Sequence, residues 1–422
     1  MQRLRTLRLG LPGKGHGNQV QQGPSILTRG NPAIHLKDHL NQIPAGRSGR
    51  VSVGPPRHQG LFSRDRNQRF SKPLSVAVAM SGGIDSAVAA LLLAHSGWSV
   101  IGLHLILPAP PSTAERRLSQ VKAVANVLEI ELHTIDISDR FRAKVIEAFV
   151  ASYRKGKTPN PCVLCNRVIK FEALSAFSRE HGLRYIATGH YAISDKGPKE
   201  EEVSLFRGFD SSRDQSYFLH RLSGEIIDRA VFPLGYLKKT EVKEIGRLVG
   251  ISHIPQGESR EICFIGKEGY RPLIEEYGPL PAGDIVDREG KVLGRHSGIH
   301  RYTIGQRHGM GLASPRPLYV TSIVPDKNLV VTGLKDDLFT RDVSGSGWVW
   351  TGKELTQKEL RCEAQIRYRH RASPGTLKIL PMGMVTFRFD EPQWAVTPGQ
   401  ALVCYLGNRV IGGAWIESQS EK

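Results

Sequence analysis

Residues 74–97 contain the pattern that most constrains the fold of this chain. LSVAVAM, at residues 74–80, is a short and continuously apolar run, typical of a strand buried on both faces of a parallel sheet. The turn SGGIDS follows, and AVAALLLAHSG then has the composition of a helix that ends at Gly97. A buried strand that leads through a short turn into a helix favours an α/β architecture.

The alternation of strand and helix patterns continues to about residue 250, which predicts a doubly wound parallel sheet in the N-terminal part of an α/β protein. After about residue 280 the segments become short and alternating, and Gly, Pro and Asp separate them. That change predicts two small antiparallel β-rich domains, the last of them barrel-like. The expected strands and helices of the first part are strands at 74–80, 99–107, 131–137 and 184–192 and helices at 87–97, 115–130, 141–156, 169–182 and 240–250.

Domain boundaries follow from these changes of pattern. We predict a disordered basic leader at 1–71, the α/β domain at 72–255, a central small β-rich domain at 256–318 and a barrel-like domain at 319–422. The first 70 residues lack periodicity, are rich in Gly, Pro, Gln and Asn, and carry +10 of the formal net charge of +18. Their Arg-rich start resembles a transit peptide, but the many Pro and Gly residues favour a non-functional extension or a misplaced start codon.

Cysteine content and hydropathy bear on the compartment. No apolar run reaches the roughly 18 residues that a membrane-spanning helix needs, so no membrane partner is expected. Five cysteines are an odd number in a long chain without a signal peptide, which favours a reducing compartment over a disulfide scaffold. We therefore predict a cytoplasmic protein, with a mitochondrion or plastid as the alternative if the leader is a transit peptide.

The turn after the first strand has the properties of an anion-binding loop. Its glycines let the backbone approach a ligand closely, its serines add hydroxyl donors, and the following helix begins with free N–H groups. The loop lacks the lysine of a Walker motif, and Asp85 fits a phosphate site if Mg²⁺ lies between them. An ordinary strand–helix turn is the alternative. The predicted nucleotide-binding residues are Ala79, Met80, Ser81, Gly82, Gly83, Asp85, Ser86, Leu105 and Gly189.

The stretch AMSGGIDSAV resembles the PP-loop of the ATP pyrophosphatases, which have an adenine nucleotide α-hydrolase-like fold. That resemblance implies ATP as substrate, cleaved to pyrophosphate and an AMP that activates a carbonyl oxygen or carboxylate. Six more stretches, collinear from about residue 74 to the C-terminus, resemble the tRNA-specific 2-thiouridylases. They are TPNPCVLCNRVIKF (158–171), ATGHYA (187–192), DQSYFL (214–219), FPLGYLKKTEV (232–242), ICFIG (262–266) and HRYTIGQRHGMGL (300–312).

This family replaces the C2 oxygen of the wobble uridine with sulfur in tRNAs for Lys, Glu and Gln. The resemblance implies that ATP adenylates the uridine oxygen and that a cysteine persulfide then delivers sulfur as AMP leaves. It implies tRNA as partner, with an upstream sulfur-carrier protein or cysteine desulfurase. By the motif match, Cys165 is the first catalytic cysteine and Cys263 bears the persulfide, and a transient disulfide forms between them.

The residues themselves agree with thiol chemistry. Sulfur transfer needs a thiolate, whose pKa is lowered by a helix N-terminus or a cation. Cys165 precedes Asn166 and Arg167, and we expect it to begin a helix, which would be an electropositive place for a reactive thiol. Cys362 and Cys404 lie outside any motif in the β-rich part, where we expect them to be small buried hydrophobic residues.

Cys162 is a departure from the family pattern, because many members carry Asp at that position. The site therefore contains three cysteines, Cys162, Cys165 and Cys263. They fit a persulfide relay with a spare resolving thiol. They also fit a [4Fe–4S] cluster with one open iron. The third alternative is that Cys162 is a bystander. A structural zinc site fits less well, because it needs four ligands.

Contacts with tRNA are expected from three segments. His190 follows a predicted parallel strand at the sheet edge where ligands bind, and the amide of Gln215 suits the edge of a pyrimidine that is flipped out of its stack. Arg301 and Arg307 interleave with aromatic residues, as in RNA-binding surfaces. The predicted strand QIRYRHR would place Arg367, Arg369 and Arg371 on one face, where they could contact phosphates.

Each of these segments also has an ordinary structural interpretation: a turn histidine, a helix cap or a charged edge strand. Two rival functions remain at this point. Another PP-loop ligase, such as argininosuccinate or GMP synthetase, would need neither the cysteine pair nor the β-rich tail. An RNA-binding protein that has lost catalysis would not be expected to keep SGGIDS, Cys165 and Cys263.

Overall fold

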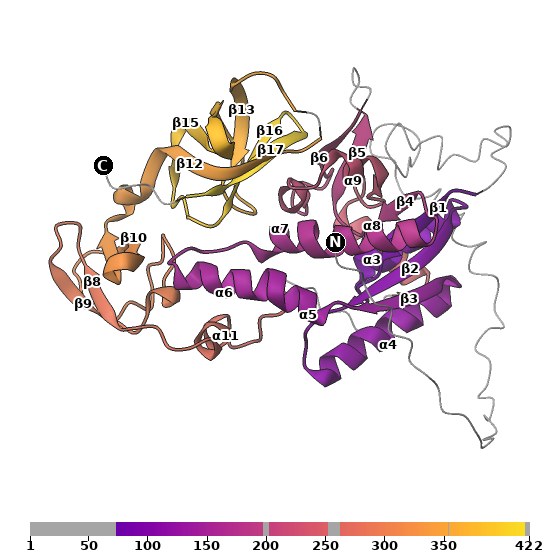
Figure 1. The fold of residues 1–422 in the computed structure, drawn as a ribbon, viewed down its shortest axis with the longest axis horizontal. Coiled ribbons are helices and arrows are strands. Elements are labelled where there is room, and N and C mark those ends of the chain that lie inside the picture. Colours follow the sequence, from indigo (N-terminus) through magenta and orange to yellow (C-terminus); the bar gives the residue numbers. More distant parts are fainter. Residues whose placement is uncertain (1–72, 197–201, 252–261, 353, 418–422) are drawn as a thin grey trace, which may run out of the picture.

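The structure is a computed structural model that describes residues 73–196, 202–251, 262–352 and 354–417. The predicted leader lies outside the described residues. Figure 1 shows three regions along the chain: an α/β sheet drawn in indigo and magenta, a small middle sheet in orange, and a C-terminal barrel in yellow. No helix among the described residues is long and apolar enough to cross a membrane.

The first region is built on a five-stranded sheet in the order β3-β2-β1-β4-β7, and every neighbouring pair in it is parallel. The chain builds outward from β1 in one direction and then crosses to its other side at β4, so the topological switch point lies between β1 and β4. The strands are β1 (Ser75–Ala79), β2 (Ser99–Ile106), β3 (Glu131–Asp136), β4 (Tyr185–Ala187) and β7 (Ala230–Val231).

Helices cover both faces of this sheet. Val76 and Val78 of β1 pack with α3 and α4 in one core cluster, whereas Ala77 packs with α8 in another, as alternating side chains of a strand require. The doubly wound α/β prediction is therefore confirmed. The helices of this region are α3 (Ile84–His95), α4 (Pro111–Leu128), α5 (Ser138–Phe141), α6 (Glu147–Arg154), α7 (Pro161–Cys165), α8 (Phe171–Glu180), α9 (Gly224–Arg229) and α10 (Lys239–Leu248).

Two helical runs contain a widened turn. The π-helical segment η1 (Arg142–Ile146) joins α5 to α6, and η2 (Asn166–Lys170) joins α7 to α8. Residues 161–180 therefore form one unbroken helical run, in which η2 follows Cys165 directly. Such π-segments are rare and are frequently found at functional sites.

The middle region is a four-stranded sheet in the order β10-β11-β8-β9, preceded by α11 (Arg271–Glu276). The β10–β11 and β8–β9 pairs are antiparallel, but β11 pairs with β8 in parallel, so the expectation of a purely antiparallel domain was wrong here. The strands are β8 (Gly283–Val286), β9 (Val292–His296), β10 (Tyr319–Val324) and β11 (Leu329–Gly333).

The C-terminal region is a barrel of six strands. They pair antiparallel in the order β12-β15-β14-β13-β16-β17, and an additional β12–β17 pairing closes the ring. The barrel-like prediction is confirmed, and Cys362 and Cys404 lie buried in its core, as expected. The strands are β12 (Phe339–Trp350), β13 (Glu359–Gln365), β14 (Ser373–Ile379), β15 (Val385–Trp394), β16 (Ala401–Leu406) and β17 (Arg409–Ile416).

Two strand predictions are corrected. The stretch 184–192 is not one strand: β4 ends at Ala187, and the hairpin of β5 (Ala192–Lys196) and β6 (Val203–Arg207) joins the barrel sheet through β17. Strand β13 ends at Gln365, and residues 366–372 form a loop. The expected arginine ladder does not exist, because the chain turns there and Arg369 adopts a positive φ of 64°.

One short segment joins all three regions. Thr158 donates its backbone N–H to Pro398 (2.8 Å) and accepts a hydrogen bond from the Gln400 amide (2.9 Å), both in the barrel region. Its hydroxyl donates to Thr303 of the middle region (3.2 Å), and the neighbouring Lys157 forms an ion pair with Glu417 (2.5 Å). These contacts fix the start of the cysteine-bearing helical run relative to both β-rich regions.

Candidate active site

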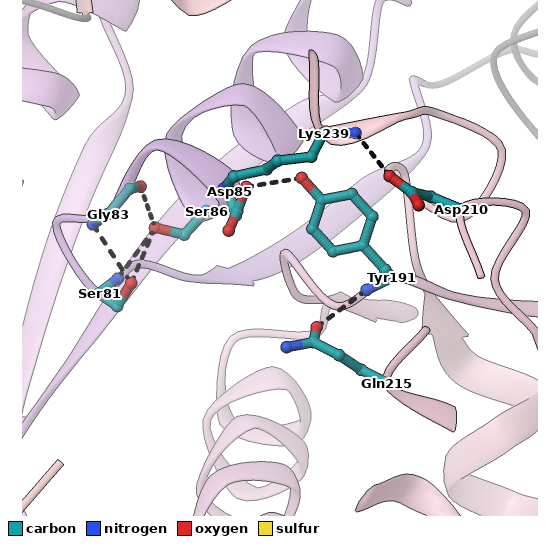
Figure 2. Close-up of polar contacts among 8 residues, drawn as sticks. All are labelled: Ser81, Gly83, Asp85, Ser86, Tyr191, Asp210, Gln215 and Lys239. Atoms are coloured by element: carbon teal, nitrogen blue, oxygen red, sulfur yellow. Dashed lines mark hydrogen bonds and ion pairs between the residues drawn. The ribbon is translucent and has the colours of Figure 1, made fainter. Parts of the chain in front are cut away.

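The loop between β1 and α3 is held in a compact conformation by its own serines. The hydroxyl of Ser86 donates to the Gly83 carbonyl (2.9 Å) and accepts from the Ser81 backbone N–H (3.2 Å), and the Gly83 N–H donates to the Ser81 hydroxyl (3.3 Å) (Figure 2). Gly82 has a φ of 83°, a conformation that glycine adopts without strain. The loop thus has the geometry expected of an anion cradle at the switch point of the sheet.

The Asp85 carboxylate meets two donors from distant parts of the chain. Its Oδ1 accepts hydrogen bonds from the Tyr191 hydroxyl (2.8 Å) and the Lys239 ammonium (2.6 Å). The Lys239 side chain is only 10% exposed, whereas that of Asp85 is 36% exposed. Asp210 accepts a hydrogen bond from the backbone N–H of Lys239 (3.0 Å; Figure 2) and so anchors the start of α10. The two donors therefore fix the orientation of the Asp85 carboxylate next to the loop.

Gly189, two residues after the end of β4, lies directly against the first turn of α3. A Cβ atom at Gly189 would lie 2.7 Å from both the carbonyl carbon of Asp85 and the backbone nitrogen of Ser86. Both are backbone atoms of the first turn of α3, and moving them would disturb the helix. Only glycine fits at this position, and its place in a nucleotide site stays a prediction.

Replacing Gly189 by alanine is expected to displace the first turn of α3. We expect a loss of about 1–3 kcal/mol in the free energy of unfolding from overpacking, together with a raised KM for ATP. Chemical denaturation and pyrophosphate release would measure the two effects. Gly224→Ala is the matched control, because the nearest atom to a Cβ there lies 3.7 Å away. Equal KM values for ATP in the two variants would contradict the close packing of Gly189 against the loop.

The three motif cysteines gather around one cation, Lys170. Lys170 lies close enough to Cys162, Cys165 and Cys263 to favour the thiolate form of each. Cys165 packs into the same hydrophobic cluster as Ile262, Phe264 and Ile265, the residues on either side of Cys263. The fold therefore brings Cys263 next to the helical run that carries the other two thiols, across about 100 residues of sequence.

Arg117 connects this thiol group to the phosphate loop. The Arg117 guanidinium donates to the backbone carbonyl of Cys263 (3.5 Å). The backbone carbonyl oxygen of Arg117 lies next to Gly82, 3.4 Å from the position that a Cβ atom would occupy there. Phe264 stacks edge-on against Phe149 of α6, with ring centroids 5.3 Å apart, and so fixes the segment that follows Cys263. The exposed Cys263 and the phosphate loop thus lie on two sides of one arginine.

The resting thiols are not the low-pKa groups that the sequence suggested. Cys165 does not begin a helix but ends α7 inside an unbroken helical run, and Arg167 is exposed, so Lys170 supplies the nearby charge. Burial raises the pKa of Cys165 to about 12 and that of Cys162 to about 11, more than Lys170 lowers them. Cys263 reaches the surface, but the protein atoms around it still raise the pKa of its thiol, whereas the charges of Lys170 and Arg117 lower it.

Alkylation of Cys165 should therefore depend steeply on pH. Because its pKa is raised to about 12, the thiolate fraction at neutral pH is small and rises about tenfold for each pH unit. We expect the iodoacetamide rate at Cys165, followed by peptide mass spectrometry, to climb from pH 7 to pH 9 without a plateau. Lys170→Ala should slow it at every pH, whereas Lys170→Arg should not. A plateau below pH 8 would contradict this environment.

Two of the predicted tRNA-contact residues adjoin Tyr191: His190 precedes it in the chain, and Gln215 is hydrogen-bonded to it. His190 is buried, its Nδ1 lies 2.7 Å from the Thr188 hydroxyl, and burial lowers its pKa well below the ordinary value. Gln215 accepts a hydrogen bond from the Tyr191 N–H through its amide oxygen (3.1 Å), while its amide nitrogen points away from this contact (Figure 2). Gln215 is thus fixed to Tyr191, the residue whose hydroxyl binds Asp85. The amide nitrogen of Gln215 is available to donate to a ligand.

The predicted arginines lie apart from one another. Arg301 forms an ion pair with Glu275 (2.6 Å) in the middle region, and Arg307 is exposed on the loop that follows. In the barrel region, Arg367 donates to the Trp394 carbonyl (3.0 Å), so part of its guanidinium is used to hold its own loop. Arg369 is exposed on the same loop.

The side chains of the described residues do not form a metal centre. Within them, no three Cys, His, Asp or Glu side chains are grouped so that they could hold a metal ion. This arrangement of Cys162, Cys165 and Cys263 therefore does not fit a [4Fe–4S] cluster. Asp85 is different, because Mg²⁺ in nucleotide sites needs only one or two carboxylates and takes its other ligands from phosphates and water.

Sequence reasoning missed Tyr191, Lys239 and Lys170, the three side chains that organise the two halves of the site. Each lies inside a motif quoted above: ATGHYA, FPLGYLKKTEV and TPNPCVLCNRVIKF. The motifs were therefore the available signal. What they could not give is which polar residue of each motif points inward, because that depends on how three distant segments meet.

Comparison with known proteins gives three family matches in series. The sequence matches the families described as "tRNA methyl transferase HUP domain" over residues 74–267, "tRNA methyl transferase PRC-barrel domain" over 271–333, and "Aminomethyltransferase beta-barrel domain" over 340–416. The protein named tRNA-specific 2-thiouridylase MnmA of Moorella thermoacetica is 42% identical over 360 residues, which cover 82% of this chain and 99% of that protein. A protein of the same name from Geobacter metallireducens is 39% identical over 358 residues, covering 81% and 96%.

Proposed function

The chain belongs to the tRNA-specific 2-thiouridylase family, and from this premise we propose that it replaces the C2 oxygen of the wobble uridine of tRNA with sulfur at the expense of ATP. The tRNAs for Lys, Glu and Gln are the proposed substrates. The observation that carries the proposal is the gathering of three motif thiols around Lys170, next to a loop suited to the phosphates of a nucleotide.

The first half-reaction is adenylation. The uridine O2 attacks the α-phosphorus of ATP, a bond to oxygen forms, and pyrophosphate leaves. The compact Ser81–Ser86 loop and the N-terminus of α3 would hold the phosphates of ATP. The positive charge of Lys239 would offset the negative charge of these phosphates and of Asp85. Mg²⁺ fits here: Asp85 would hold it, and it would neutralise charge on the departing pyrophosphate. AMP is then a far better leaving group than the oxygen of a pyrimidine carbonyl.

The second half-reaction transfers sulfur. A persulfide on Cys263 attacks C2 through its outer sulfur, and AMP departs with the electron pair of the C2–O bond. The Cys165 thiolate then attacks the inner sulfur. A Cys165–Cys263 disulfide forms, and the electron pair of the cleaved S–S bond stays on the sulfur at C2. The disulfide must be reduced by an external thiol before the next turnover.

A sulfur-carrier protein or cysteine desulfurase would charge Cys263, and the exposure of that residue supports such a delivery. Cys162, which lies near Cys263, is the spare resolving thiol in this scheme. No step is assigned to an iron–sulfur cluster, because the described residues do not fit one. We place the reaction in the cytoplasm, as proposed from the cysteine content.

Release of pyrophosphate that depends on unmodified tRNA tests the proposal against its rivals. The proposed enzyme should release pyrophosphate from ATP only when a tRNA with a wobble uridine is present, with no amino acid or nucleotide cosubstrate. Release that requires such a small cosubstrate would favour another PP-loop ligase. Binding of tRNA without any release would favour an RNA-binding protein that has lost catalysis.

A further inference from the structure

Helix α4 packs one of its faces directly against the phosphate loop. A Cβ atom at Gly82 would lie 3.4 Å from atoms of Arg117 and Gln120 and 3.3 Å from the side chain of Val121. These three residues are spaced i, i+3 and i+4, so they share one face of the helix. Arg117 therefore lies on the face of α4 that meets the loop, whereas the exposed Arg116, one residue earlier, lies on another face.

The half-buried guanidinium of Arg117 interacts with both halves of the site. It donates to the backbone carbonyl of Cys263 over 3.5 Å, which is a long and weak hydrogen bond. On the loop side it faces His104, whose Nδ1 lies 2.7 Å from the carbonyl oxygen of Met80. Burial lowers the pKa of His104, and the charge of Arg117 lowers it further. His104 is therefore neutral near pH 7, and the positive charge at this position comes from Arg117.

The phosphate loop needs a cation that its own residues do not supply. The loop contains Asp85 but no lysine or arginine. The Lys239 ammonium is bound to the Asp85 carboxylate (2.6 Å), which offsets much of its charge, and Arg213 lies close to the carboxylate of Asp210. Within the described residues, Arg117 has no carboxylate at ion-pair distance. Its charge is therefore available to an anion in the loop.

The proposed mechanism places this guanidinium near the phosphate that departs. The persulfide of Cys263 attacks C2 of the uridine, and the oxygen on that carbon carries the α-phosphate from which pyrophosphate has left. A group that contacts the Cys263 backbone and borders the loop therefore lies close to the leaving group. A guanidinium has five N–H donors, so one can remain on the Cys263 carbonyl while a second edge binds two phosphate oxygens.

We propose that Arg117 is a further catalytic residue, whose guanidinium binds the departing pyrophosphate while it keeps its contact with the Cys263 carbonyl. Negative charge grows on pyrophosphate as the bond between the α-phosphorus and the bridging oxygen breaks, so the contact is stronger in the transition state than with bound ATP. The electron pair of that bond stays on pyrophosphate, and Arg117 transfers no proton. This inference rests on the proposed function, because it takes adenylation as the reaction.

Steady-state kinetics of adenylation test this role. Arg117→Gln should lower kcat by about 10- to 150-fold, the effect of one hydrogen bond to a charged group, and leave the KM for ATP within about threefold of wild type. Arg117→Lys should recover part of kcat, because it restores the charge without the paired donors. The matched control is Arg116→Ala, which should behave like wild type. A raised KM with unchanged kcat in Arg117→Gln would show that Arg117 only shapes the loop, and would overturn the inference.

Binding of pyrophosphate to the protein without tRNA gives a readout that does not depend on activity. Burial raises the pKa of the Cys263 thiol, and the charges of Lys170 and Arg117 lower it. Pyrophosphate with Mg²⁺ would offset the charge of Arg117, so the rate of iodoacetamide alkylation at Cys263 should fall about threefold in wild type. Arg116→Ala should show the same fall, and Arg117→Gln should show none.

Calorimetric titration of the same proteins with pyrophosphate and Mg²⁺ completes the test. Arg117→Gln should bind pyrophosphate about tenfold more weakly than wild type or Arg116→Ala. Equal affinity in the two variants, or an equal effect of pyrophosphate on the alkylation of Cys263, would overturn the inference. Wild-type protein that binds pyrophosphate through Arg117 but makes no 2-thiouridine would instead overturn the proposed function.

Discussion

Asp85→Asn should abolish tRNA-dependent pyrophosphate release, with a loss of about 10³-fold or more in kcat/KM. The change keeps the size of the side chain but removes its charge, so Lys239 loses its anionic partner, and the Mg²⁺ of the proposed mechanism would lose its carboxylate ligand. Binding of tRNA should stay within about twofold of wild type, because no proposed RNA contact is changed. Radiolabelled ATP hydrolysis and filter binding would measure the two quantities.

Tyr191→Phe is the matched control for this prediction. It removes one hydrogen bond to Asp85, 2.8 Å long, and leaves the carboxylate and Lys239 in place. We expect its pyrophosphate release to fall by about 10- to 150-fold, less than that of Asp85→Asn, because one hydrogen bond to a charged group contributes about 1.5–3 kcal/mol. Pyrophosphate release by Asp85→Asn at the wild-type rate would refute the assignment of the loop as the site of adenylation.

Cys263→Ser should separate the two half-reactions completely. Adenylation should proceed at nearly the wild-type rate, because the side chain of Cys263 is not part of the phosphate loop. Sulfur incorporation should fall below detection, because a hydroxyl cannot carry a persulfide. Adenylated RNA and pyrophosphate should therefore accumulate without thiolated product, which gel shift and mass spectrometry would detect.

Cys362→Ser provides the comparison for that experiment. It removes a thiol from the core of the barrel, away from Lys170, and we expect both half-reactions to persist in the protein that folds. A variant that lacks both resolving thiols, Cys162→Ser with Cys165→Ser, should differ from both: sulfur should become attached to the RNA while the RNA remains joined to Cys263. Thiolated, free tRNA from Cys263→Ser would exclude the assigned role of that residue.

The local part of the fold could be predicted from the sequence. The structure from Ser75 to His95 can be predicted from local sequence, because a buried strand, a glycine turn and an apolar helix follow one another without interruption. The barrel could likewise be predicted from short alternating segments. These features depend on neighbouring residues alone, and periodicity reports them directly.

Features that depend on tertiary contact could not be predicted. The β5–β6 hairpin looks like part of the α/β domain in sequence, yet it joins the barrel through Arg409 opposite Phe206. The stretch 365–371 has a strand-like alternation, but the Arg367–Trp394 contact holds it as a loop. The pKa of Cys165 was expected to be low from its polar neighbours in sequence, whereas burial raises it. In each case the deciding partner lies far away along the chain.

Analysis of the nucleosides in the product tRNA tests the central claim most directly. Unmodified tRNA would be incubated with the protein, ATP, cysteine and a cysteine desulfurase, then digested and examined by liquid chromatography and mass spectrometry. We predict 2-thiouridine at the wobble position, in an amount that depends on ATP and equals the AMP released. Unmodified uridine in the presence of active sulfur donor, or a methylated nucleoside, as the wording of two of the matching family descriptions would suggest, would contradict the account.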